Sequence, residues 1–246
     1  MAKSPEERTP APTGHGSEPA TATSRAEIDA FLSEVRAFER GPATGRRGRL
    51  IFALDATMSR QPTWDTACRL QADMFLEAQA IGGLDVQLLY FRGLNECRAS
   101  RWVSEPAALA ALMEKIECHG GLTQIRRVLS HARAETEKTR VQALVYVGDA
   151  MEEKIDHLCV RAGELGLRGV PAFMFQEGHD ADVERAFREI ARLSHGAYCR
   201  FDAGAAHELR ELLRAVAAYA AGGMKALDDL SARRNAGAIK LLEQMR

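Results

Sequence analysis

Three short apolar runs constrain the fold of this chain more than any other feature. They are RLIFAL (49–54), QALVYV (142–147) and VPAFMF (170–175), and each is almost continuously apolar. Strands that are covered by helices on both faces have this composition, whereas strands with one face in water alternate between apolar and polar residues. The runs therefore predict central strands of a mostly parallel sheet.

The rest of the chain alternates between strand-like and helix-like patterns. Further strands are predicted at 85–91, 97–103 and 197–201, and helices at 62–80, 106–117, 123–137, 152–166, 181–194 and 205–221. Segment 97–103 mixes charges into its pattern and follows 85–91 after a short Gly-Leu-Asn turn, which predicts an antiparallel edge strand. Regular alternation of strands and helices indicates an α/β fold with a doubly wound, mostly parallel sheet.

The two ends of the chain differ from this central part. Residues 1–23 are rich in Pro, Thr, Ala and Gly without apolar periodicity, which predicts a disordered tail. In 24–41, Ser24 and Glu27 have the capping-box spacing and an apolar stripe follows, which predicts an amphipathic helix. Segment 222–246 begins with Gly-Gly and then repeats apolar residues, so we expect one helix or two short ones, packed on the domain or on a partner.

Composition excludes several classes of partner. Lys and Arg total 33 against 34 acidic residues, so nucleic acid and anionic membranes are not expected partners. No apolar stretch approaches the roughly 20 residues of a membrane span, and residues 1–24 lack the apolar region of a secretory signal. The five cysteines are scattered without a CxxC pair. These features predict a cytoplasmic protein with reduced thiols.

Oxygen-bearing side chains occupy three loops that such a sheet brings to one edge. Asp55, Thr57 and Ser59 follow the first apolar run, Thr123 follows Gly-Gly just before a helix, and Asp149 follows the run QALVYV. Ligands of open α/β sheets bind beyond the carboxyl ends of the strands, where the strand order reverses. Carboxylates and small hydroxyls suit a hard divalent cation such as Mg²⁺, which prefers oxygen ligands in octahedral geometry.

This constellation resembles the metal-ion-dependent adhesion site (MIDAS) of von Willebrand factor A (VWA) domains. Asp55, Thr57 and Ser59 match the motif D-x-[ST]-x-S, while Thr123 and Asp149 match the separate threonine and the second aspartate. The resemblance implies a Rossmann-like, three-layer VWA domain over residues 46–221. It also implies Mg²⁺ or Mn²⁺ bound by these five residues, and binding of a protein partner rather than catalysis. The resemblance also implies a place beside an ATPase or in a multi-protein assembly, as for members of the family inside bacterial cells.

Two departures from the family pattern concern the charge and space of the site. Thr57 replaces the usual serine, which keeps the hydroxyl and adds a methyl group. Ala150 follows Asp149 where glycine is common, and Glu152 and Glu153 come shortly after it. These two acids favour a helix N-terminus and lie close enough to alter the charge of the site.

The same residues also fit simpler roles and other functions. Asp55 also suits a turn whose backbone amides it would bind, and Ser59 and Thr123 also suit helix N-caps. The leading hypothesis is an interaction module that binds a carboxylate of a partner protein through a metal ion. A phosphoryl-transfer enzyme with Asp55 as nucleophile is disfavoured, because Thr57 stands where phosphatases of the haloacid-dehalogenase type carry a second acid. A metal-independent scaffold that uses its terminal helices is the third possibility.

Overall fold

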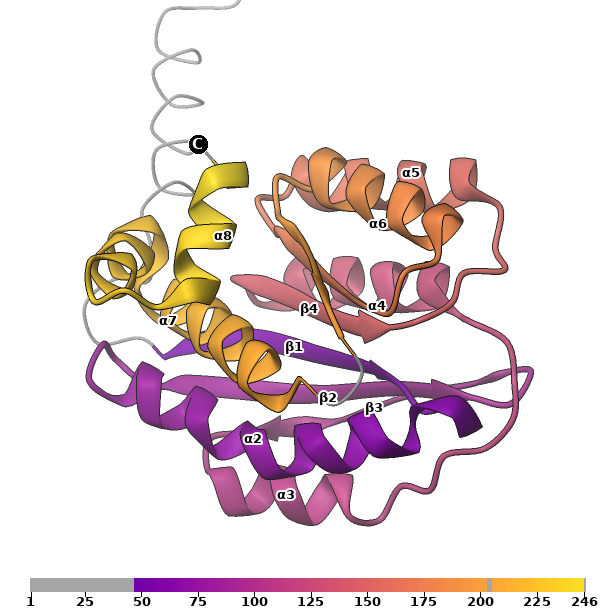
Figure 1. Ribbon diagram of the computed structural model, residues 1–246, viewed down its shortest axis with the longest axis horizontal. Helices are drawn as coiled ribbons and strands as arrows, with labels where there is room; N and C mark the ends of the chain where they lie inside the picture. Colours follow the sequence, from indigo (N-terminus) through magenta and orange to yellow (C-terminus); the bar gives the residue numbers. More distant parts are fainter. Residues whose placement is uncertain (1–46, 203–204, 246) are drawn as a thin grey trace, which may run out of the picture. The chain divides into compact units, whose positions relative to one another are not determined.

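A computed structural model describes residues 47–202 and 205–245, and its sheet has six strands in the order β3-β2-β1-β4-β5-β6 (Figure 1). The strands are β1 (Gly48–Asp55), β2 (Leu84–Arg92), β3 (Glu96–Val103), β4 (Ala143–Gly148), β5 (Ala172–Glu177) and β6 (Tyr198–Phe201). Only the β2–β3 pair is antiparallel within this sheet. The predicted mostly parallel sheet with an antiparallel edge strand is confirmed. The predicted tail (1–23) and first helix (24–41) lie outside the described residues.

Helices cover both faces of the sheet. They are the 3-10 helix η1 (Met58–Arg60), α2 (Gln61–Gln79), α3 (Pro106–Met113), α4 (Ile125–Lys138), α5 (Ile155–Gly166), α6 (Ala181–Leu193), α7 (Ala206–Ala232) and α8 (Ala236–Met245). Helices α2, α3, α7 and α8 share one apolar cluster with the sheet, and α4, α5 and α6 share the other. The three-layer α/β prediction is confirmed.

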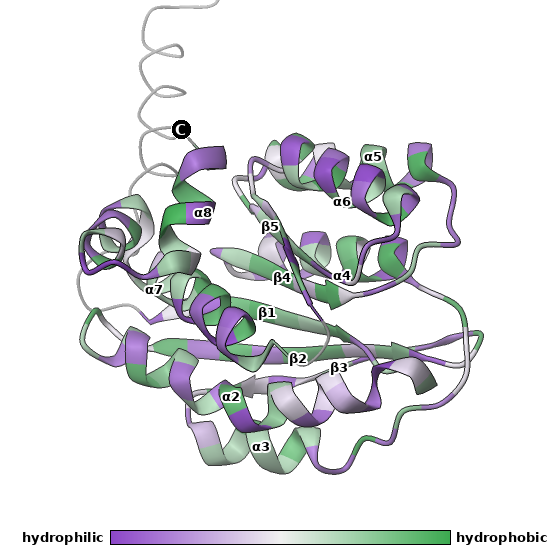
Figure 2. Ribbon diagram, in the orientation of Figure 1, coloured by the Kyte–Doolittle hydropathy of each residue, from purple (hydrophilic) through white to green (hydrophobic). Residues whose placement is uncertain are grey.

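The apolar runs explain why the sheet has two cores. Along β1, Leu50, Phe52 and Leu54 join the cluster under α2 and α7, whereas Ile51 and Ala53 join the cluster under α4. Successive side chains of a strand point to opposite faces, so only a continuously apolar strand can fill both cores. Figure 2 shows this as apolar colour running along the central strands.

The C-terminal segment packs on the domain. Helix α7 passes through Gly222-Gly223 with a kink at Gly223, whose positive φ of 68° suits glycine. Beyond the kink, Leu227 and Leu230 are buried, as are Leu241 and Leu242 of α8. The sequence left open whether this segment packs on the domain or on another protein. In the described structure it packs on the domain.

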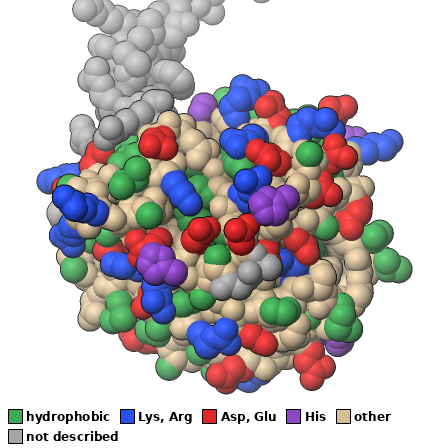
Figure 3. Space-filling model, viewed as in Figure 1, with side chains coloured by type: hydrophobic (Ala, Val, Ile, Leu, Met, Phe, Trp, Pro, Cys, Tyr) green, Lys and Arg blue, Asp and Glu red, His purple; other side chains and the backbone are tan. Residues whose placement is uncertain are grey.

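The described surface carries no dominant charge sign in the face that Figure 3 shows, where basic and acidic side chains are interspersed. The five cysteines all lie in described segments and are unpaired, as predicted. Within the described part of the chain, every helix is too short or too polar to cross a membrane.

Candidate metal centre

The five predicted site residues line one pocket of about 230 Å³ at the carboxyl edge of the sheet. Strands β1 and β4 are neighbours, and the chain leaves them toward opposite sides of the sheet, so the pocket lies at the reversal of strand order. The lining residues are Asp55, Thr57, Met58, Ser59, Gly120, Gly121, Thr123, Asp149, Ala150 and Glu152. The predicted site residues of different loops are 26 to 94 positions apart in sequence, from the pair Thr123 and Asp149 to the pair Asp55 and Asp149, and the packing of their strands and helices brings them together.

Asp55 ends β1 and is almost wholly buried, with 2% of its surface exposed. Its Oδ1 accepts a hydrogen bond of 2.8 Å from the Thr57 amide. One carboxylate oxygen of Asp55 therefore has the predicted role in the turn, because it binds a backbone amide. Its Oδ2 is buried without a hydrogen-bond partner among the described residues. Because a buried carboxylate oxygen without a partner is unfavourable, the second oxygen requires a cation or a donor from outside.

Two hydroxyls and the second aspartate face the same space. The Oγ1 of Thr57 lies 3.5 Å from the Oγ of Ser59, which donates a long bond of 3.3 Å to Asp149 Oδ2. The other oxygen of Asp149 is buried and has no partner in the described segments. These contacts are long for O–H···O bonds, so the hydroxyl oxygens keep lone pairs for another ligand.

Thr123 lines the same pocket and forms hydrogen bonds with Glu152. Its hydroxyl donates to Glu152 Oε2 at 2.6 Å and accepts from the Glu152 amide at 3.1 Å, which leaves one lone pair. The N-cap of α4 is Gln124 rather than Thr123, and Ser59 lies within η1. The alternative roles of these two residues as N-caps were therefore wrong.

The two acids after Asp149 have separate roles. Glu153 accepts hydrogen bonds from the amides of Ile125 and Arg126, so it caps the N-terminus of α4 from another loop. Burial raises the pKa of Glu153, and the bonds from these two amides oppose the rise. Glu152 instead lines the pocket and adds negative charge beside Thr123. The sequence predicted such an effect on the charge of the site for both acids, and Glu153 is not among the residues that line the pocket.

Arg60 and Glu177 are the residues at the site that the sequence analysis missed. The Arg60 side chain is 3% exposed, forms an ion pair with Glu177 at the end of β5, and lies 3.7 Å from Asp149 Oδ2. The Thr63 hydroxyl also donates to Glu177. Each charge by itself resembles an ordinary surface residue in the sequence. The only available signal was the position of each one beside a strand end.

Asp55 gives the metal-free protein a pH dependence of stability. Burial raises the pKa of Asp55 from its ordinary 3.8 to about 6, although the Thr57 amide opposes the rise. The folded protein therefore holds this proton more tightly than the unfolded chain, so Asp55 lowers the free energy of unfolding as the pH rises from about 4 to about 6.

The variant Asp55→Asn should not lose stability as the pH rises from about 4 to about 6. Urea unfolding in EDTA measures the free energy of unfolding of both proteins. Relative to wild type, the variant should gain up to about 3 kcal/mol of stability between acid and neutral pH, because each pKa unit corresponds to about 1.4 kcal/mol. Parallel pH curves for the two proteins would contradict the assignment of this titration to Asp55.

Two adjacent glycines offer a matched test of the loop that carries Thr123. A Cβ atom at Gly121 would lie 2.3 Å from the backbone of Gly93, whereas a Cβ atom at Gly120 meets nothing within 4 Å. Gly121→Ala must therefore displace the loop from the β2–β3 turn, and Gly120→Ala need not. If Thr123 binds a metal ion, Gly121→Ala should weaken Mn²⁺ binding about tenfold and Gly120→Ala less than twofold, as measured by calorimetry. Equal affinities would remove Thr123 from the set of ligands.

The donor set fits a hard divalent cation. Two aspartates each keep a buried oxygen without a partner in the described structure, and three hydroxyls surround the same space. Within residues 47–202 and 205–245, no three His, Cys, Asp or Glu side chains are grouped closely enough to hold a metal. Any ion here therefore depends on hydroxyl oxygens as well as carboxylates, which favours Mg²⁺ or Mn²⁺ over metals that prefer sulfur and imidazole.

No protein-family model and no curated protein matches the sequence. Among solved structures, an aerotolerance-related membrane protein from Bacteroides fragilis is 17% identical with a TM-score of 0.51, over 68% of this chain and 96% of that one. The SpRpn10 VWA domain is 10% identical with a TM-score of 0.53, over 65% and 90%. Proximal thread matrix protein 1 from the mussel byssus, with a zinc-occupied MIDAS motif, is 14% identical with a TM-score of 0.55, over 71% and 46%. At such identities the likeness concerns the fold, and the chain has the fold of a von Willebrand factor A domain.

Proposed function

We propose that this protein is an interaction module that binds a divalent cation, Mg²⁺ or Mn²⁺, and through it a carboxylate of a partner protein. Asp55, Thr57, Ser59, Thr123 and Asp149 would hold the ion. The observation that carries the proposal is the pair of buried aspartate oxygens without partners in the described chain, facing three hydroxyls across one pocket. A dication there would satisfy both oxygens at once.

The charges around the pocket support recruitment of an acidic group. When bound, the ion supplies an electrophilic centre for one further anionic oxygen. Arg60 lies 3.7 Å from Asp149 and partly offsets its charge, so the two aspartates do not fully neutralise a dication. Glu152 acts in the opposite direction, but its carboxylate is held by the hydroxyl and the amide of Thr123.

The comparisons support this class of function at the level of the fold. Solved structures with the same fold include a pilus adhesin from Lactobacillus rhamnosus GG, which is 10% identical with a TM-score of 0.55 over 74% of this chain and 31% of that one. The mussel protein carries zinc in its MIDAS motif. By analogy with the metal of the mussel protein and the adhesive role of the pilus protein, we propose that this chain binds a partner through a metal ion.

Water relaxation by Mn²⁺ tests the proposal directly. Mn²⁺ bound to the protein enhances the relaxation of exchanging water, and a carboxylate that displaces a water ligand lowers the enhancement. We expect a pentapeptide with a central Glu to lower it at millimolar concentration, and the matched Gln peptide to leave it unchanged. EDTA should abolish both the enhancement of water relaxation by bound Mn²⁺ and its decrease by the Glu peptide. Identical responses to the two peptides would refute recruitment of a carboxylate.

The other two functions predict different results. The described residues that line the pocket include no lysine, histidine or cysteine, which disfavours catalysis. Hydrolysis of p-nitrophenyl phosphate with Mg²⁺ that is lost in Asp55→Asn would establish the enzymatic alternative. A metal-independent scaffold would instead retain its partner in EDTA and lose it after deletion of 1–40 or of 222–246.

A further inference from the structure

The last strand leaves one edge of the described sheet open. Strand β6 pairs only with β5, through bonds from Met174 N to Ala197 O (2.9 Å) and from Gly178 N to Phe201 O (3.2 Å). Because the backbone groups of successive residues in a strand point to alternate sides, those of Tyr198 and Arg200 point away from β5. These two residues therefore form the free edge.

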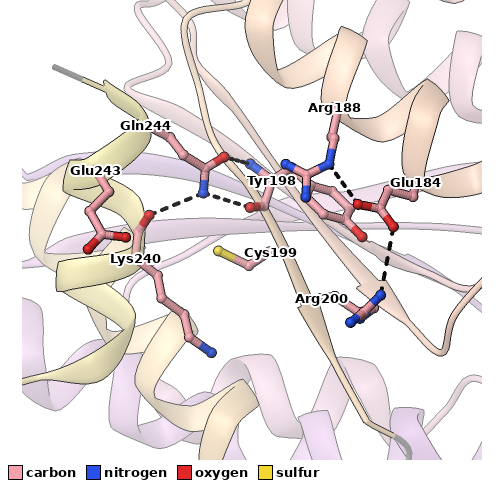
Figure 4. A pocket seen from close by; sticks show the side chains of 8 residues that line it. All are labelled: Glu184, Arg188, Tyr198, Cys199, Arg200, Lys240, Glu243 and Gln244. Atoms are coloured by element: carbon pink, nitrogen blue, oxygen red, sulfur yellow. Dashed lines mark hydrogen bonds and ion pairs between the residues drawn. The ribbon is translucent and has the colours of Figure 1, made fainter.

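A side chain from α8 occupies half of this edge as a strand would. The Gln244 amide accepts from Tyr198 N at 2.9 Å and donates to Tyr198 O at 2.8 Å. Figure 4 shows the amide beside the strand, with both of its hydrogen bonds to the Tyr198 backbone. An amide side chain that bonds to both backbone groups of one residue reproduces the pair of bonds made by a neighbouring strand.

The other half of the edge is not paired. Outside the β5–β6 ladder, no hydrogen bond from another described residue reaches the amide or the carbonyl of Arg200. Next to it lies a groove of about 260 Å³ between α6 and α8, with β6 as its floor. Unpaired edge groups beside a groove are the features that bind an extended peptide by adding it to the sheet.

The charges of the groove indicate which peptide it suits. Glu184 is already engaged by Arg188 at 2.8 Å and lies 3.7 Å from Arg200. Lys240 forms no ion pair with the described residues, and its ammonium group points away from the carboxylate of Glu243 (Figure 4). Basic groups thus exceed acidic ones in the groove, which favours an occupant with carboxylates. Two copies paired through β6 would bring their basic groups together, so charge disfavours self-association.

We propose that the β6 edge binds an extended acidic peptide as an additional strand, and that Gln244 competes with the peptide for Tyr198. The peptide would pair with the backbone of Arg200 and displace the Gln244 amide, while its carboxylates face Lys240 and Arg200. This site lies outside the candidate metal centre and requires no ion.

Backbone NMR of the full chain in EDTA tests the proposal with a synthetic probe, the capped peptide Val-Glu-Val-Glu-Val. We expect shifts of the Tyr198 and Arg200 amides, and of the Gln244 side-chain amide, at millimolar peptide. Gln244→Ala should tighten binding about tenfold, because the peptide no longer competes for two hydrogen bonds. Arg200→Pro should abolish binding, since proline removes an amide that points away from β5 and spares the β5–β6 ladder.

Matched peptides separate pairing of the strand from simple attraction of charge. The same peptide with alternate N-methylated amides keeps its carboxylates but cannot pair, and it should not bind. The lysine version, Val-Lys-Val-Lys-Val, should bind at least tenfold more weakly. The proposal is overturned if the acidic peptide leaves these amides unshifted, if the N-methylated peptide binds equally, or if Gln244→Ala forms dimers without peptide.

Discussion

Replacing Asp55 or Asp149 by alanine is expected to lower the affinity for Mn²⁺ at least about 100-fold in calorimetric titrations. Each aspartate would supply one of the two full negative charges nearest the ion, and each has a buried oxygen without another partner in the described chain. Loss of one charge leaves hydroxyl dipoles that bind a dication far more weakly. Thr57→Val and Thr123→Val keep the side-chain volume and remove one neutral donor, so about tenfold losses are expected.

The control for these variants is a threonine of the same kind away from the pocket. The Thr66 hydroxyl, on α2, donates to the Pro62 carbonyl and does not line the pocket. Thr66→Val therefore removes a hydroxyl group that is not part of the site. Its affinity for Mn²⁺ should equal that of wild type. Circular dichroism should confirm that all the variants are folded. If wild type, Asp55→Ala and Asp149→Ala bind Mn²⁺ equally, the metal proposal is wrong.

The second large effect concerns stability. Arg60→Met should lower the free energy of unfolding by about 3–5 kcal/mol, because it leaves Glu177 charged without its cation in a site where that carboxylate is only 11% exposed. Chemical unfolding in urea measures the change. The Thr63 hydroxyl still donates to Glu177 in the variant, but one neutral hydrogen bond compensates little for a lost cation.

Two further variants separate the ion pair from general damage to the core. Arg60→Met combined with Glu177→Met removes both charges, so the double variant should recover most of the lost stability. Arg185 and Asp182 form an ion pair of 2.7 Å with side chains that are 74% and 75% exposed, so Arg185→Met should change stability by less than about 0.5 kcal/mol. A double variant no more stable than Arg60→Met would show that Arg60 acts through packing alone.

The sheet could be predicted because its signal is local. Continuous apolar runs identify β1, β4 and β5 as strands buried on both faces, and the charged pattern of 97–103 identifies the edge strand β3. The five candidate ligands were also predictable, since each stands beside a strand end or a helix start. Their convergence on one pocket follows once the order of the strands is known.

Other parts of the site depend on pairs of residues that no local pattern connects. Arg60 and Glu177 are 117 positions apart, and each alone reads as a solvated charge. Glu153 caps α4, although it precedes α5 in the sequence. Gln244 covers the edge of β6 from a helix 46 positions further along the chain. Such contacts require the packed fold before they can be recognised.

The sequence by itself predicted which segments are strands, which oxygen-bearing residues line the pocket, and an interruption of the last long helix at Gly-Gly (222–223), because these properties depend on spacing along the chain. Tertiary structure alone decided which charges are buried as partners and, within the described residues, which oxygens of Asp55 and Asp149 lack a partner and which sheet edge is unpaired. The physical reason is that burial and pairing depend on distances in space, and residues far apart in sequence acquire those distances only when the layers pack.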